Sequence, residues 1–100
     1  MDRAALEQEW LRLTRDVLPE LATTRGWPIR FDHCFQRVLL DQVFGGVWYG
    51  HVSGRPAYRH LNDDDLRRAL LLAGDIASGR ADLAGLNRQS LSWRRAAKAR

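Results

Sequence analysis

The sequence DHCFQRVLLDQVF occupies residues 32–44 and is followed by two glycines at 45 and 46. Asp32 belongs to the residue types that commonly cap a helix, and a glycine directly after a helix often takes the left-handed conformation that ends it. Apolar side chains cover most sides of this segment: Phe35, Val38, Leu39, Leu40, Val43 and Phe44. A helix with such a wide apolar surface is usually surrounded by other elements. We therefore expect a central helix over residues 32–44.

The segment before this helix has a narrower apolar stripe. Its apolar side chains recur in steps of three and four residues: Leu6, Trp10, Leu13, Val17 and Leu21. This spacing predicts an amphipathic helix over residues 2–25. Pro19 interrupts it, because proline lacks the N–H that would bond to the carbonyl of residue 15. We expect a kink at residues 15–18, or a new short helix with Pro19 in its first turn.

A third helix is predicted after residue 61. Asn62 is a capping residue type, and residues 63–65 are all aspartate. Carboxylates in the first turn of a helix favour its positive end, so capping explains the three aspartates better than metal binding does. Gly79 is the expected end of this helix.

A last helix is predicted from Asp82, its cap, with a stripe that reaches Trp93. Residues 94–100 form a basic segment without large apolar side chains, and we expect them to be a frayed tail. The predicted fold is therefore all-α, a single-domain bundle of about four helices over residues 1–93. An irregular loop over residues 45–61 separates helices two and three, with a short hairpin as the alternative for part of it.

Composition and charge narrow the class of protein. The chain has 100 residues, 45% hydrophobic and 28% charged, which is typical of one globular domain. Residues 88–100 hold five of the 16 basic residues and no acid, leaving 11 basic against 12 acidic residues elsewhere. This distribution predicts a basic tail rather than a basic face. The charged N-terminus and the absence of an apolar run of about 20 residues favour a cytoplasmic protein with no membrane segment.

Candidate chemistry is concentrated between Arg30 and His60, a stretch that holds every histidine, the only cysteine and both tyrosines. His33, Arg37 and Asp41 are spaced four residues apart and share one line along the predicted central helix. The line is either the solvent side of the helix or one wall of a groove, where a histidine acts as an acid, a base or a ligand contact. Arg37 and Asp41 are close enough on a helix to pair with each other.

Aromatic and arginine side chains alternate in the same stretch. Such a mixture suits a protein interface, a single-stranded nucleic acid or a phosphorylated small molecule, and it also suits simple packing of a loop on the core. The candidate binding residues are Arg30, His33, Arg37, Asp41, Trp48, Tyr49, Arg55, Tyr58 and His60. The four Cys and His side chains lack the spacing of a zinc site, and we predict no metal and no cofactor.

The segment RFDHCFQRVLLDQVFGGVWY, together with the later RPAYRHL and LNRQSLSWR, resembles a pattern found in small bacterial proteins of uncharacterised function. The resemblance spans residues 28–95. It implies no function and no site residue.

Three hypotheses of function follow from these residues. The first is a small cytoplasmic binding or accessory module that acts through the surface from Arg30 to His60 on a protein partner, or forms a homodimer there. The second is a nucleic-acid-binding protein that uses arginine, aromatic residues and the basic tail. The third is a small enzyme or enzyme subunit, transferase-like, that uses His33, Arg37 and Asp41. A small-molecule ligand is less expected, and no known catalytic motif is present.

Overall fold

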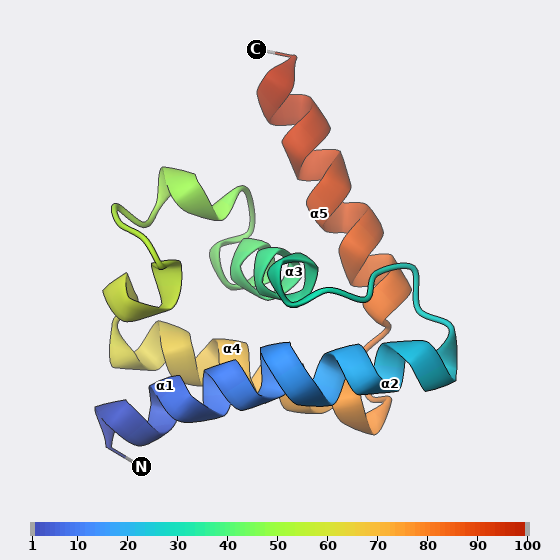
Figure 1. The fold of residues 1–100 in the computed structure, drawn as a ribbon. Coiled ribbons are helices and arrows are strands. Elements are labelled where there is room, and N and C mark those ends of the chain that lie inside the picture. Colours follow the sequence, from blue (N-terminus) through green and yellow to red (C-terminus); the bar gives the residue numbers. More distant parts are fainter. Residues whose placement is uncertain (1, 100) are drawn as a thin grey trace.

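The computed structural model describes residues 2–99, and within this range it contains helices and no strand (Figure 1). Its α-helices are α1 (Arg3–Arg12), α2 (Leu18–Arg25), α3 (Asp32–Phe44), α4 (Asp63–Ser78) and α5 (Leu83–Lys98). A π-helical turn, η1 (Leu13–Val17), joins α1 to α2, so these two run as one long helix. The protein is therefore an all-α bundle of four helical units, as the sequence predicts.

The long helix α1–α2 and helix α4 lie side by side and form the lower layer in Figure 1. Helix α3 packs on this layer and is seen end-on above it. Helix α5 packs against α3 and rises steeply away from the lower layer, so its C-terminal half stands near the loop that follows α3. Among the described residues, none of the helices combines the length and the apolar character needed to cross a membrane.

Helix α3 is the centre of the core. Phe35, Val38 and Leu39 are fully buried in it, and they pack with Trp10 of α1 and Leu66 of α4. The helix begins at Asp32 and ends at Phe44, and Gly45 has the left-handed conformation (φ 66°) that stops it. The expected central helix is confirmed, with its bounds.

The long helix changes its geometry just before Pro19. The backbone N–H of Leu18 bonds to the carbonyl of Leu13, five residues back instead of four. Pro19 follows directly, in the first turn of α2. A π-helical turn is one of the recognised causes of a helix irregularity, and proline has no N–H to continue the regular pattern. The change of helix type lies at Leu13–Val17, and Pro19 lies in the first turn of α2, as the second of the two predicted alternatives has it.

The loop after α3 is ordered and packed rather than extended. It contains two short 3₁₀ turns, η2 (Trp48–Gly50) and η3 (Ala57–His60), and no strand, so the alternative of a hairpin is wrong. Its buried side chains join the core: Val52, Ala57, Tyr58 and Leu61. Arg3 fixes η3 from outside, because it donates hydrogen bonds to the Tyr58 carbonyl (2.8 Å) and to Asp63 (2.9 Å). Its hydrogen bond to Glu7, aided by Asp63, raises the pKa of Arg3.

The three predicted caps differ in the structure. Asp32 is not the cap of α3, because it is the first helical residue and Phe31 holds the cap position, without a side-chain capping bond. The Asn62 side chain accepts a hydrogen bond from the Asp65 backbone N–H at 2.8 Å, which confirms it as the cap of α4. Asp82 precedes α5, but its side chain makes no capping hydrogen bond. Helix α5 continues to Lys98, so the expectation of a frayed tail from residue 94 is wrong for residues 94–98. Arg100 lies outside the described residues.

Candidate functional site

Asp41 lies at the centre of a buried polar network that joins α3, α5 and η2. Its side chain is fully buried, and its two oxygens accept hydrogen bonds from four donors. These are the Trp48 backbone N–H (3.0 Å), the Ser90 hydroxyl (2.6 Å) and Arg94 through Nε (2.9 Å) and Nη2 (3.2 Å). A carboxylate removed from water is tolerated only when its charge and lone pairs are matched in this way. Asp41 therefore holds the three elements together.

Arg37, one turn before Asp41 on α3, extends this network. It donates to the Ser90 hydroxyl (2.7 Å) and to the Asn87 side-chain carbonyl (2.8 Å). The Ser90 hydroxyl thus accepts from Arg37 and donates to Asp41, while the ion pair of Asp41 is with Arg94. The expected direct pair between Arg37 and Asp41 is wrong, and so is the expectation that this line is simply the solvent side of the helix.

Of the three residues of the enzyme hypothesis, His33 and Arg37 line one cavity and Asp41 does not. Both oxygens of Asp41 are occupied, so its carboxylate is not free to act as a base. The side chain of His33 is 77% exposed, beside Asp32. The other two histidines lie apart from it, because His51 stacks on the Phe44 ring and His60 packs against Gly54. The described residues also contain no group of three or more His, Cys, Asp or Glu side chains that could hold a metal.

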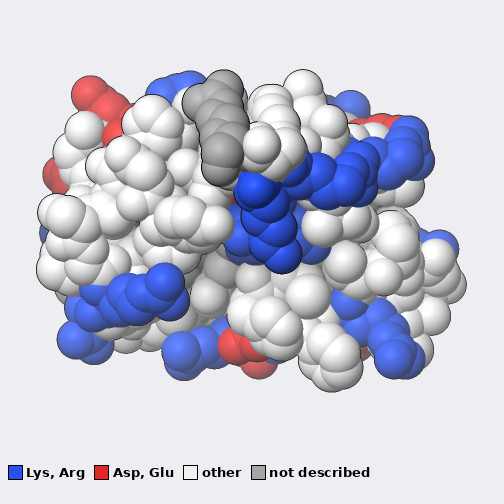
Figure 2. Space-filling model, turned by 90° about the horizontal axis from the view of Figure 1, so that it is seen from above, with Lys and Arg blue, Asp and Glu red and all other residues white. Residues whose placement is uncertain are grey.

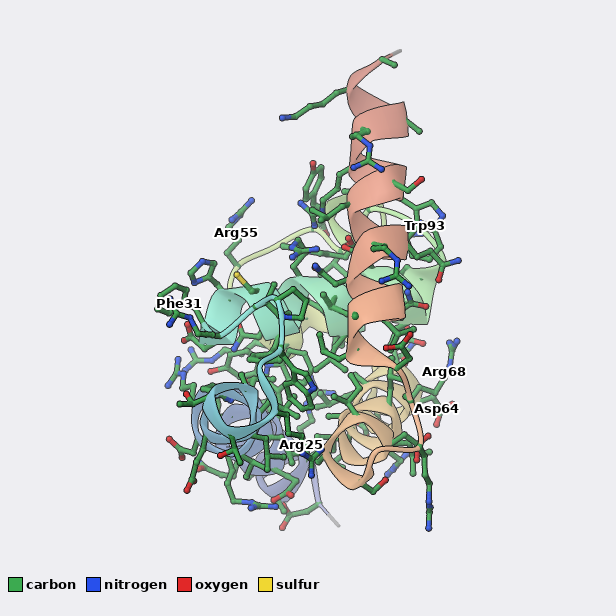
Figure 3. All side chains as sticks on the ribbon, turned by 90° about the vertical axis from the view of Figure 1, so that its right-hand side faces the viewer. Arg25, Phe31, Arg55, Asp64, Arg68 and Trp93 are labelled. Atoms are coloured by element: carbon green, nitrogen blue, oxygen red, sulfur yellow. The ribbon has the colours of Figure 1, made fainter. Side chains whose placement is uncertain are left out.

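Several predicted binding residues do share one cavity of about 220 Å³, which we call the α3 pocket. It lies between α1, α3 and the loop. The predicted residues that line it are His33, Arg37, Trp48, Arg55 and Tyr58. Arg30, Tyr49, His60 and Asp41 are not part of its wall. Arg30 instead lies over the exposed ring of Phe31 at the start of α3, which points away from the body of the molecule in Figure 3.

Tyr49 belongs to a second surface, which we call the Tyr49 patch. The tyrosine is 55% exposed, and Leu91 beside it is 39% exposed. They share a shallow depression with three cations of α5: Arg94, Arg95 and Lys98. The guanidinium of Arg94 lies over the Tyr49 ring, 5.4 Å from its centroid.

The contribution of α5 to these surfaces is missing from the sequence predictions. A signal for it was present, because Asn87, Ser90 and Arg94 are three and four residues apart and form one polar stripe. Such a stripe matches the polar line of Arg37 and Asp41 on α3. The partners lie about 50 residues apart in the chain, however, and the spacing alone does not say that these two stripes meet.

Acidic and basic residues are distributed unevenly over the described part of the chain. Residues 33–60 and 83–99 contain a single acid, the buried Asp41. Against it stand seven basic residues: Arg37, Arg55, Arg59, Arg88, Arg94, Arg95 and Lys98. The other described residues hold eight basic and eleven acidic side chains. Figure 2 shows the side formed by α5 and the loop, where blue side chains are widespread and red ones are few. Positive charge on this side therefore comes from the loop as well as from the C-terminal residues.

No family model matches this chain, and comparisons with curated proteins and with solved structures found no match. The resemblance to small bacterial proteins stays a prediction.

Proposed function

We propose that this domain is a protein-binding module and that its partner is an acidic, partly apolar protein segment. The observation that carries the proposal is the Tyr49 patch. An exposed tyrosine and an exposed leucine lie side by side there, and the charged groups around them are all cations. Tyrosine and arginine are the residue types that most often anchor protein interfaces.

The charge around the patch selects the kind of partner. Arg95 and Lys98 line the depression, and Asp41, which pairs with Arg94 there, is buried. Cations around an apolar centre attract a segment with acidic residues and disfavour a basic one. Arg55 and Arg59 continue the positive charge along the loop. The contact surface therefore includes the loop that the sequence predicts, together with the C-terminal half of α5.

Nucleic acid fits this surface less well. A stacking site for bases needs open aromatic faces and mobile cations that follow the phosphates. Here one face of Tyr49 is covered by Arg94, and one face of Trp48 is covered by Arg55 at 5.6 Å. Arg94 is also fixed by its ion pair with Asp41. Leu91, at the centre of the patch, offers nothing to a phosphate backbone.

A peptide-display selection tests the proposal. Random peptides are selected on the wild-type domain and counter-selected on Tyr49→Ala, a change at an exposed side chain that leaves the core intact. We expect the enriched peptides to combine acidic and apolar residues and to bind Tyr49→Ala at least about tenfold more weakly, a loss of roughly 1.4 kcal/mol. Leu71→Ala is the matched control, because Leu71 is exposed on α4, outside the patch.

Two results would contradict the proposal. One is a selection that enriches no sequence on the wild type over Tyr49→Ala. The other is tight binding of single-stranded oligothymidylate that weakens steeply with salt and depends on Tyr49, which would assign the face to nucleic acid.

A further inference from the structure

The α3 pocket is distinct from the Tyr49 patch, and the two share no residue. Its volume of about 220 Å³ is below the range of roughly 300–1,000 Å³ that is usual for drug-sized ligands. A group of a few heavy atoms therefore fits it. Two arginines, Arg37 and Arg55, belong to its wall, and no acidic residue does.

We infer that this pocket binds a carboxylate carried on a small flat apolar group, of which benzoate is the simplest example. The charge of the pocket supports an anion. Neither Arg37 nor Arg55 forms an ion pair with an acidic side chain among residues 2–99. Arg55 extends outward from the loop above α3 (Figure 3), and its guanidinium lies over the ring of Trp48, which also lines the pocket.

Arg37 supplies a cation that is already oriented. Its Nη1 and Nη2 atoms are held by Ser90 and Asn87, and Ser90 is held in turn by Asp41. A guanidinium fixed in this way loses little conformational entropy when a ligand binds, and its planar N–H groups match the plane of a carboxylate. With two of its donor atoms already engaged, it is better suited to a monoanion than to a phosphate.

Trp10 contributes a buried, unpaired donor beside the pocket. It lines the pocket, it is only 1% exposed, and its indole N–H has no hydrogen-bond partner. Among the described residues this is the one buried side-chain nitrogen or oxygen without a partner. Unpaired buried donors are costly and rare in native proteins, and they call for a specific explanation. The indole nitrogen is itself buried, so a bound acceptor reaches it only if the side chains around it shift.

The remaining walls explain the preference for a flat apolar body. Trp48 and Tyr58 contribute aromatic rings, and Leu40 and Pro56 contribute aliphatic surface. A carboxylate attached to an aromatic ring matches this combination, because its charged end meets the arginines while its ring contacts apolar side chains.

The test is a titration of the full chain followed by proton–nitrogen NMR, in which the indole N–H groups of the four tryptophans are resolved reporters. Benzoate is the probe, and benzamide, with the same shape and no charge, is its control. We expect saturable shifts of the Trp10 and Trp48 indole signals with benzoate and none with benzamide. Arg55→Gln weakens binding at least about tenfold. Arg59→Gln is the matched control and changes nothing, because Arg59 is on the same loop outside the pocket.

Three outcomes would overturn the inference: equal shifts with benzamide, undiminished binding to Arg55→Gln, or tighter binding of inorganic phosphate than of benzoate. Trp10→Phe removes the unpaired donor and is expected to weaken benzoate binding several-fold; an unchanged affinity would exclude the indole as a ligand contact. Competition then identifies the natural source of the carboxylate. If the protein partner supplies the carboxylate, benzoate displaces a peptide selected on the domain. If a free acid supplies it, benzoate and the peptide bind together.

This result is separable from the proposed function. If benzoate binds but no peptide is selected, the inference about the pocket holds and the proposed function is wrong. Peptide binding that depends on Tyr49, without benzoate binding, shows the reverse.

Discussion

At the scale of single residues, Asp41 is the one charged residue that is fully buried in the described part of the molecule. Its replacement by asparagine removes the charge that balances Arg94 and replaces one acceptor oxygen by a donor. Removing one partner of a buried ion pair leaves the other charge uncompensated, so we expect Asp41→Asn to lower the free energy of unfolding by about 3 kcal/mol. Urea denaturation measures this as a lower midpoint with an unchanged slope.

Asp64→Asn is the control for Asp41→Asn, because the Asp64 side chain is 91% exposed, on the outer side of α4 (Figure 3). We expect it to change stability by no more than about 0.5 kcal/mol. Equal midpoints for the two variants would show that the Asp41 network contributes no stability.

Sequence patterns identified Asp41 as a candidate but not its role. Helical spacing correctly aligned it with Arg37, since that relation is local and follows from 3.6 residues per turn. Its burial and its pairing with Arg94 depend on how α5 packs on α3, a contact between segments 53 residues apart. His33, on the same line, is exposed, so even one helical face divides between core and solvent.

At the scale of elements, the two capping positions make a direct contrast. Asn62 accepts a hydrogen bond from the Asp65 N–H, whereas Asp82 accepts none at the start of α5. We expect Asn62→Ala to lower the free energy of unfolding by about 1 kcal/mol and Asp82→Ala to lower it by clearly less. Thermal denaturation of the two variants side by side checks this. A larger loss for Asp82→Ala would contradict it.

The loop between α3 and α4 depends on a close approach of Gly54 and His60. A methyl group placed at Gly54, which has φ 157°, would come within 2.5 Å of the His60 ring. We expect Gly54→Ala to cost about 1–3 kcal/mol through this overlap and the backbone strain.

The steric part of that cost has its own test. In a His60→Ala background the ring is absent, so Gly54→Ala should cost about 1 kcal/mol less than it does in the wild type, as measured by a double-mutant cycle in urea. An identical cost in both backgrounds would leave backbone strain as its only cause.

Most bounds of the helices could be predicted from the sequence, whereas the structure of the loop could not. The bounds of α3 and the irregularity before Pro19 follow from local signals: a glycine stop, an apolar surface and a missing N–H. The two 3₁₀ turns of the loop show no helical spacing of apolar residues, and they are held by contacts with α3 and α1. The sequence predicted fraying after residue 93 because residues 94–100 lack large apolar side chains. The prediction failed because Arg94, although charged, is held by its ion pair with Asp41.

At the scale of the whole molecule, the division of charge results from packing. The basic C-terminal residues and the nearly acid-free stretch after His33 are separate in the sequence. Taken alone, each segment carries only a small excess of positive charge. Packing α5 beside α3 and the loop brings them onto one side of the molecule (Figure 2), where residues 33–60 and 83–99 contain one acid, the buried Asp41.

This division of charge also predicts the oligomeric state. A symmetric homodimer through the Tyr49 patch would bring Arg95 and Lys98 of one copy against the same residues of the other, and like charges at an interface are unfavourable. We therefore expect the domain to sediment as an 11.5 kDa monomer at low ionic strength over a wide range of concentration. Salt screens the repulsion, so any weak self-association through this patch should increase with salt. A compact dimer that is tightest at low salt and dissociates in Tyr49→Ala would contradict the prediction, because it would mean that the acidic half of a second copy occupies the patch.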